Sequence, residues 1–204
     1  MRFSSLHRVR GILIVFAAGW LVSGHLLALR AADEKAGPKP NPTIDLGDGN
    51  IILTAPDGWV RKAPKVRFID HEFGVPAAKG DTEDGRVTVM GAGGTVDANI
   101  DRWIGQFSQI DGSDTKNQVA EANRKKTISG LEIRFVDLSG TYKEMSRPFD
   151  PNAAAVERKD YRMLAAIIAS PTLGNYFIKF YGPRQTVTAH ADEFGKMIDG
   201  LKVK

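Results

Sequence analysis

The chain has 204 residues, of which 42% are hydrophobic and 25% charged, and it contains no cysteine. It is long enough to form a core of its own, but it can form no disulfide, thiolate metal site or cysteine nucleophile. The formal net charge of +4 comes from four arginines among the first 31 residues; the remaining 24 Lys and Arg balance 24 Asp and Glu, so the net charge does not indicate a nucleic-acid-binding surface.

The first 31 residues are typical of an export signal. Arg2, Arg8 and Arg10 form a basic head, an uncharged stretch covers residues 11–29, and Ala31 is a small residue at a candidate cleavage site. The uncharged stretch is also long enough to span a bilayer as an N-terminal anchor helix. A cleaved signal peptide and an uncleaved anchor are both left open. Because the basic head stays in the cytoplasm, either one exports the rest of the chain.

The remainder of the chain divides at about residue 46. Residues 32–45 are polar and contain three prolines, which predicts a flexible linker. Residues 46–204 show no internal repeat and predict one globular domain.

Short apolar or alternating runs predict six to seven strands in this domain. Two turn sequences, Ser129-Gly130 and the segment 171–174 (PTLG), each join two runs as a hairpin. The run at 161–170 is apolar on both faces, which indicates a central strand. The predicted runs are 51–56, 65–76, 86–93, two within 118–144, 161–170 and 175–183.

Two helices are predicted where apolar residues recur at helical spacing, over residues 96–107 and 187–201. Hairpin connections dominate between the strands, so we expect an α+β fold: a mainly antiparallel sheet flanked by two helices, preceded by the hydrophobic N-terminal helix.

The glycine-rich segment 91–94 (GAGG) lies between a predicted strand and a predicted helix, as in many phosphate-binding sites. A dinucleotide fingerprint needs a third glycine, but Val96 occupies that position, and no P-loop sequence occurs in the chain. We therefore interpret Gly91 and Gly93 as a structural turn, with Thr95 capping the helix and Asp97 in its first turn. The general attraction of helix N-termini for anions is the remaining alternative.

Asp70-His71-Glu72 is a candidate metal or acid–base cluster. On an alternating strand, Asp70 and Glu72 share one face and His71 points to the other. His190 is the only further histidine after the N-terminal segment, so a zinc site would need scattered carboxylates. We expect neither a metal site nor a cofactor here.

Asp81, Glu83 and Asp84 could together hold calcium weakly, but their spacing lacks the pattern of a calcium-binding loop, so a solvated turn is expected. The basic run 124–126 is expected to be a solvated face. Four tyrosines in predicted strands are expected to pack in the sheet, not to form a ligand platform: Tyr142, Tyr161, Tyr176 and Tyr181.

Residues 145–160 predict a long irregular loop between two strands. Such loops are often functional or disordered. Phe149, with Pro148 and Pro151 beside it, is the part expected to contact a partner.

Three segments resemble a group of uncharacterised exported bacterial proteins: GAGGTVDANIDRWIGQF, YRMLAAIIASPTLGNYFIKFYGP and TVTAHADEFGKMIDGLK. The order of elements over residues 46–204 is similar to the PsbP-like α/β/α sandwich. This resemblance implies an antiparallel sheet flanked by helices and a role as a binding or assembly factor. It carries over no functional residue.

The sequence contains no recognisable catalytic constellation. We therefore predict an exported, non-enzymatic domain, periplasmic, secreted or anchored, that binds a protein or another envelope component and no nucleic acid. One alternative is a periplasmic protein that binds a small ligand or metal ion through the glycine turn or the Asp70–Glu72 face. A hydrolase that uses His71 or His190 is a further alternative.

Overall fold

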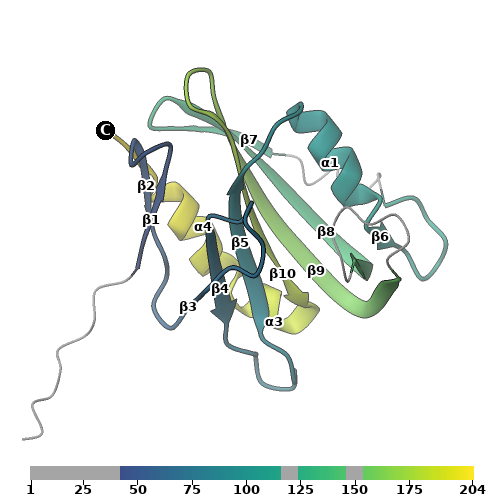
Figure 1. The fold of residues 1–204 in the computed structure, drawn as a ribbon. Coiled ribbons are helices and arrows are strands. Elements are labelled where there is room, and N and C mark those ends of the chain that lie inside the picture. Colours follow the sequence, from purple (N-terminus) through teal and green to yellow (C-terminus); the bar gives the residue numbers. More distant parts are fainter. Residues whose placement is uncertain (1–41, 116–123, 146–153) are drawn as a thin grey trace, which may run out of the picture. The chain divides into compact units, whose positions relative to one another are not determined.

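The computed structural model describes residues 42–115, 124–145 and 154–204, which all belong to one unit, Lys39–Lys204. The predicted signal or anchor and its candidate cleavage residue Ala31 lie outside the described residues. Strands dominate the fold, with three helices in the described part, and every strand pair there is antiparallel (Figure 1). The predicted α+β class with a mainly antiparallel sheet is therefore confirmed.

The larger sheet has eight strands in the order β3-β4-β5-β10-β9-β8-β6, with β7 also paired to β8. The two long hairpins, β7–β8 and β9–β10, place β9 in the middle of this sheet, as its two apolar faces predict. The strands are β3 (Val60–Lys62), β4 (His71–Val75), β5 (Gly85–Gly91), β6 (Phe107–Ser108), β7 (Arg124–Ile128), β8 (Leu131–Met145), β9 (Ala155–Ser170) and β10 (Gly174–Pro183).

A second, three-stranded sheet was not predicted. It consists of β1 (Thr43–Leu46), β2 (Ile51–Thr54) and β11 (Lys202–Val203). β1 occupies residues assigned to the linker, so the boundary near residue 46 is wrong by a few residues. The physical reason is burial: the side chains of Ile44 and Leu46 are 0% and 3% exposed, which holds this segment against the core.

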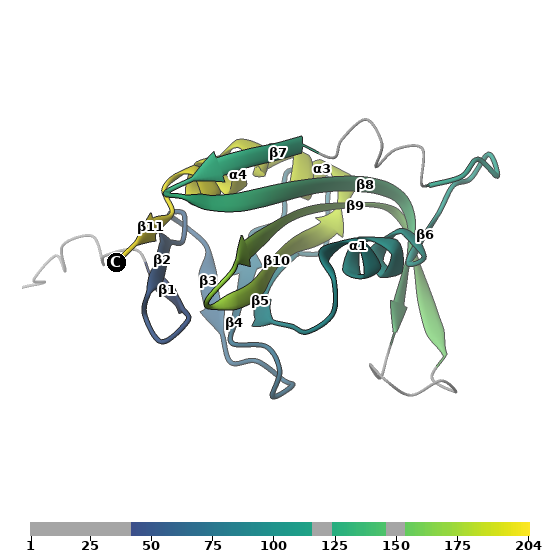
Figure 2. The same ribbon diagram turned by 90° about the horizontal axis from the view of Figure 1, so that it is seen from above.

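Helices cover both faces of the larger sheet (Figure 2). The helix α1 (Val96–Ile104) lies on one face, and α3 (Arg184–Ala189) and α4 (Ala191–Asp199) lie on the other. The helix predicted over 187–201 is thus two helices, because the backbone leaves helical geometry at His190, with φ −103° and ψ 11°. The apolar stripe continues across this break, which is why periodicity alone missed it.

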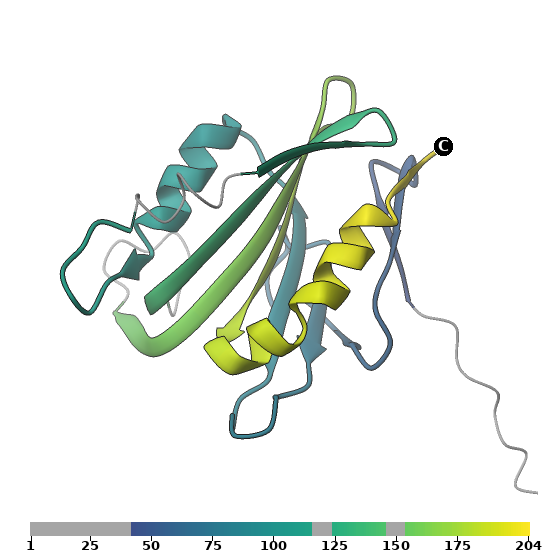
Figure 3. The ribbon, with the colours of Figure 1, turned by 180° about the vertical axis from the view of Figure 1, so that it is seen from behind.

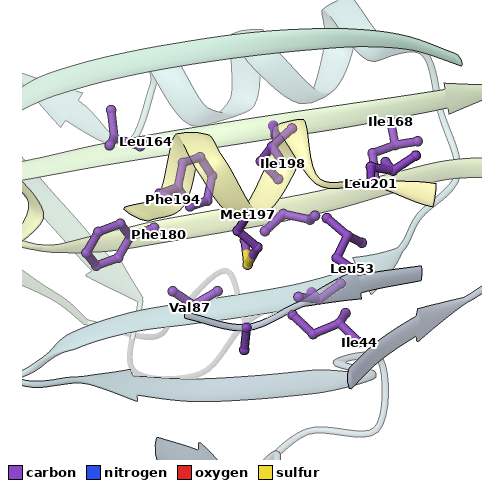
Figure 4. Close-up of a cluster of buried hydrophobic side chains, with 14 of the residues drawn as sticks. Ile44, Leu53, Val87, Leu164, Ile168, Phe180, Phe194, Met197, Ile198 and Leu201 are labelled. Atoms are coloured by element: carbon purple, nitrogen blue, oxygen red, sulfur yellow. The ribbon is translucent and has the colours of Figure 1, made fainter. Parts of the chain in front are cut away.

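Each face of the sheet has its own hydrophobic core. One core packs Phe194, Met197 and Ile198 of α4 against the larger sheet and against Ile44 and Leu53 of the smaller one (Figure 4). The other core packs α1, through Ile100 and Trp103, against the opposite face. The described unit therefore has a helix–sheet–helix arrangement, seen from behind in Figure 3.

Two predicted segments differ from the structure. Only residues 71–75 of the run 65–76 form a strand. The predicted loop 145–160 is wrong at both ends, because β8 continues to Met145 and β9 begins at Ala155; Pro148, Phe149 and Pro151 lie outside the described residues.

The hairpin at Ser129-Gly130 is confirmed. Both residues have positive φ, 49° and 82°, as a two-residue type I′ turn requires.

Candidate functional site

A groove of about 640 Å³ lies on the α4 side of the larger sheet, between α4 and the edge strand β7. We call it the α4–β7 groove. Its floor comes from β8 and β9 and its walls from β7 and α4. The lining residues used below are Arg124, Lys126, Phe135, Asp137, Arg162, Leu164, Phe194, Gly195, Lys196 and Asp199.

Apolar side chains form part of the floor of the groove, where alternate residues of neighbouring strands point to the same face. Phe135 of β8 and Leu164 of β9 lie on the face that carries α4, and Phe194 of α4 packs in the same core. On the helix, Gly195 leaves the wall open: a Cβ atom built at this position meets no atom within 4 Å. The groove therefore offers both open space beside α4 and apolar surface on its floor.

Two ion pairs lie at the margins of the groove. Arg162 donates from Nε and Nη2 to the two carboxylate oxygens of Asp137, at 2.9 and 2.7 Å, and these contacts raise the pKa of Arg162 despite its partial burial. Lys126 of β7 donates to Asp199 of α4 at 2.6 Å, which ties the strand to the helix.

Two further cations in the lining, the exposed side chains of Arg124 and Lys196, have no ion-pair partner in the described part of the chain. The run 124–126 is solvent-exposed, as predicted, but it also forms a wall of the groove, which the sequence did not indicate. An apolar floor beneath Arg124 and Lys196 suits a ligand that carries both negative charge and apolar groups.

A buried lysine lies on the opposite face of the sheet. Lys179 of β10 is only 8% exposed, and its Nζ donates to Oε1 of Gln106 at 3.3 Å. The Nζ atom lies 5.1, 5.7 and 5.8 Å from the ring centroids of Tyr181, Trp103 and Tyr142. Cation–π attraction to these rings favours the charged amine.

Burial acts in the opposite direction on this amine. Desolvation, with smaller contributions from the positive charges of Arg102 on α1 and Arg86 on β5, lowers the pKa of Lys179 to about 7. Lys179 was missed in the sequence, although a charged residue between Ile178 and Phe180 in a buried strand was a usable signal.

The tyrosines pack in the sheet, as predicted. Tyr142 and Tyr181 are 5% and 7% exposed, Tyr161 stacks on Tyr142 with 6.1 Å between ring centroids, and the hydroxyl of Tyr176 donates to the carbonyl of Leu173. Their additional role as the enclosure of Lys179 was not predicted.

The Asp70-His71-Glu72 cluster is not brought together. Asp70 precedes β4 and accepts from the backbone N–H of Gly91 at 3.1 Å. Glu72 is 7% exposed and accepts from Nε and Nη2 of Arg86 at 3.0 and 2.9 Å, and Nη1 of Arg86 donates to the hydroxyl of Tyr181 at 2.6 Å. Glu72, Arg86 and Tyr181 thus form a partly buried hydrogen-bond network.

Arg86 keeps its charge in that network. Burial disfavours its charged form, but the hydrogen bonds to Glu72 and Tyr181 and the negative charge of Glu72 outweigh burial, so its pKa is raised.

The two histidines make different contacts. Nη1 of Arg61 lies 2.8 Å from Nδ1 of His71, and since a guanidinium only donates, Nδ1 accepts and Nε2 donates to the carbonyl of Asp45 at 2.9 Å. The ring of His190 faces two acceptors, Glu193 at 2.7 Å and the carbonyl of Pro76 at 3.1 Å. The four ring nitrogens of His71 and His190 thus contact one guanidinium, one carboxylate and two backbone carbonyls.

The three carboxylates that were considered as a weak calcium site, and expected to form a solvated turn, each have a separate partner. Asp81 accepts from the backbone and hydroxyl of Thr186, Glu83 from the hydroxyl of Tyr161, and Asp84 from the backbone N–H of Ala77. In the described part of the chain, no group of three His, Asp or Glu side chains could hold a metal ion.

The glycine turn connects β5 to α1. Gly91 ends β5, and the hydroxyl of Thr95 accepts from the N–H of Ala98 at 3.1 Å, which confirms the predicted cap. The side-chain amide of Asn99 donates to the carbonyls of Gly93 and Thr95.

Across residues 42–115, 124–145 and 154–204, no helix has the length and apolar character needed to cross a bilayer.

No family model matches the chain, and no curated protein matches it in sequence. Among solved structures, it is similar to cyanobacterial PsbP (CyanoP) from Synechocystis sp. PCC 6803, with 11% identity, a TM-score of 0.47, and coverage of 83% of this chain and 96% of that chain. It is also similar to LpqN, involved in cell envelope biogenesis of Mycobacterium tuberculosis, with 12% identity, a TM-score of 0.48, and coverage of 80% and 90%. Both scores lie below 0.5, so the PsbP-like assignment stays a prediction.

Proposed function

We propose that the chain is an exported, non-enzymatic binding domain that holds an acidic, partly apolar segment of a protein partner in the α4–β7 groove. The observation that supports this most directly is the position of Arg124 and Lys196, which have no ion-pair partner among the described residues, beside an apolar floor.

The chemistry of the groove favours such a segment. An acidic side chain gains a counter-charge at Arg124 or Lys196, and a neighbouring apolar side chain can cover Phe135 and Leu164. The exposed pair Lys126–Asp199 contributes little by itself, about 0.2–1 kcal/mol, so it can exchange partners at low cost.

Export is proposed from the sequence alone. The basic head, the uncharged stretch 11–29 and the small residue Ala31 are the features of a secretory signal or anchor. The mass of the mature protein, with its membrane or soluble fractionation, tests this part separately.

Gly195 offers a direct test of the groove. Gly195→Met places a long side chain into open space, whereas Gly195→Ala adds only a methyl group and favours the helix by about 1 kcal/mol. Binding is measured by fluorescence anisotropy with a labelled short peptide that has aspartates flanking a central Leu-Phe pair, and with a counterpart that has lysines in place of the aspartates.

We expect the acidic peptide to bind wild type and Gly195→Ala, and to bind Gly195→Met at least about tenfold more weakly. The basic peptide should not bind. Equal binding of both peptides, or no binding of either, contradicts the proposal. Displacement of the acidic peptide by octanoate at equal molar concentration would favour a small anionic ligand instead.

A further inference from the structure

In the described part of the chain, the strand β7 pairs with β8 alone, so its other backbone edge has no strand beside it there. Four of its five residues are exposed. Unpaired edges of this kind present N–H and C=O groups to which a strand from another chain can bind.

The register identifies which backbone groups point outward. Ser129 and Gly130 form a two-residue type I′ turn, so the flanking pair Ile128–Leu131 is hydrogen-bonded. Hydrogen-bonded and non-hydrogen-bonded pairs alternate along an antiparallel ladder. The N–H and C=O groups of Lys125 and Thr127 therefore point away from β8, about 7 Å apart along the strand.

The charge of β7 selects what can bind there. Its sequence, RKKTI, begins with three consecutive cations and contains no acidic residue. Lys125 pairs with Glu132 at 3.4 Å, but both side chains are more than half exposed, so this pair is weak. Lysines on an edge repel basic strands and disfavour neutral ones, which would cover the charges without balancing them, whereas an acidic strand gains favourable contacts.

We propose that β7 is a docking edge, at which an extended acidic segment of a protein partner adds as a further strand by hydrogen bonding to the backbone of Lys125 and Thr127. This goes beyond the groove function, because it uses the outward backbone groups of β7, whereas the groove uses side chains, including Arg124 of β7.

Thr127→Pro tests the proposal at a single N–H group. Proline at this position removes the outward donor but no hydrogen bond of the β7–β8 ladder, so the fold is expected to be retained. Thr127→Ala is the matched control, since it keeps the donor. The probe is a labelled peptide of alternating Glu and Val, and the readouts are anisotropy and hydrogen exchange at the amides of Lys125 and Thr127.

We expect the probe to bind wild type and Thr127→Ala, to bind Thr127→Pro at least about tenfold more weakly, and to slow exchange at both amides. N-methylation of all peptide bonds of the probe, which removes the donors of both of its edges, should abolish binding to wild type, a result that does not depend on the folding of the proline variant. Gly195→Met should leave this binding unchanged.

Three outcomes overturn the proposal. The first is that the probe does not bind at all, in which case the cations of β7 serve to prevent strand addition at this edge. The second is that N-methylation has no effect on binding. The third is that binding is lost with Gly195→Met and kept with Thr127→Pro. The last outcome supports the groove and rejects the edge, so failure of one proposal is distinguishable from failure of the other.

Discussion

The Nζ atom of Lys179 lies 3.3 Å from Oε1 of Gln106, and this hydrogen bond joins the centre of the larger sheet to the segment that follows α1. No carboxylate is among the causes that shift the pKa of this amine; burial lowers it, and the charges of Arg102 and Arg86 lower it further. When the Lys179 amine is protonated, its burial in the core beneath α1 therefore lowers the stability of the fold.

Replacing Lys179 should stabilise the protein at neutral pH. The pKa falls from its ordinary value of 10.5 to about 7, and each pKa unit corresponds to about 1.4 kcal/mol. Lys179→Met should raise the free energy of unfolding at pH 7 by about 2–4 kcal/mol, less than the whole difference because the contacts to the rings and to Gln106 are lost. Urea unfolding measures this change.

The same substitution predicts a pH dependence. Between about pH 7 and pH 10.5 the unfolded chain holds the proton on Lys179 and the folded chain does not, so the stability of wild type rises with pH through this window. Lys179→Met should lack this contribution. Lys179→Arg, which cannot lose its charge, should be destabilised throughout the window. Equal pH slopes for wild type and Lys179→Met would reject the burial argument.

Breaking the buried pair of Glu72 and Arg86 should destabilise the fold. Glu72→Gln leaves the guanidinium of Arg86 without its counter-charge in a partly buried site, and we expect a loss of about 2 kcal/mol, reduced from the fully buried case because Arg86 is one-third exposed. Glu132→Gln, in an exposed pair with Lys125, is the control, with a change below about 0.5 kcal/mol. Chemical denaturation compares the two; similar small losses would mean that the Glu72 network is not structurally important.

Gly140 should not tolerate a side chain. Its φ is 145°, and a Cβ atom there would lie 2.6 Å from the carbonyl oxygen of Ser108, in the neighbouring strand β6. Gly140→Ala should lower the free energy of unfolding by about 2 kcal/mol or more. Gly93→Ala, where an added Cβ meets nothing within 4 Å, should change it by less than about 0.5 kcal/mol. Thermal unfolding of both variants measures these changes. An unchanged stability of Gly140→Ala would contradict the close approach of β6.

The cap of α1 provides a smaller, separate effect. Thr95→Ala removes the acceptor of the Ala98 N–H and should cost about 1 kcal/mol. Thr95→Ser keeps the acceptor and should restore most of that stability. Hydrogen exchange at the first turn of α1 reports the change directly; unchanged exchange in Thr95→Ala would show that the Thr95 hydroxyl does not protect this turn.

Local chemistry made some elements predictable. The Ser129-Gly130 turn and the cap at Thr95 depend on a few neighbouring residues, so the sequence identified both. The first half of β9, in contrast, is largely exposed on both faces, so no apolar alternation marks it as a strand, and residues 155–160 were predicted as loop.

Long-range packing decided what sequence reasoning missed. β1 contains only two apolar residues, Ile44 and Leu46, and it is a strand because β2 and the core lie beside it. The α4–β7 groove depends in the same way on residues far apart in sequence, such as Arg124 and Gly195. The sequence around these two residues gave no local signal for a ligand site. The one unusual feature was a glycine, Gly195, inside a predicted helix.

The most direct test of the groove is an amide chemical-shift titration of the folded domain with the aspartate-containing peptide. The account predicts the largest shifts at Phe135, Leu164 and Gly195, which line the groove, and their loss in Gly195→Met. Shifts confined to other surfaces, or none at millimolar peptide, would contradict it.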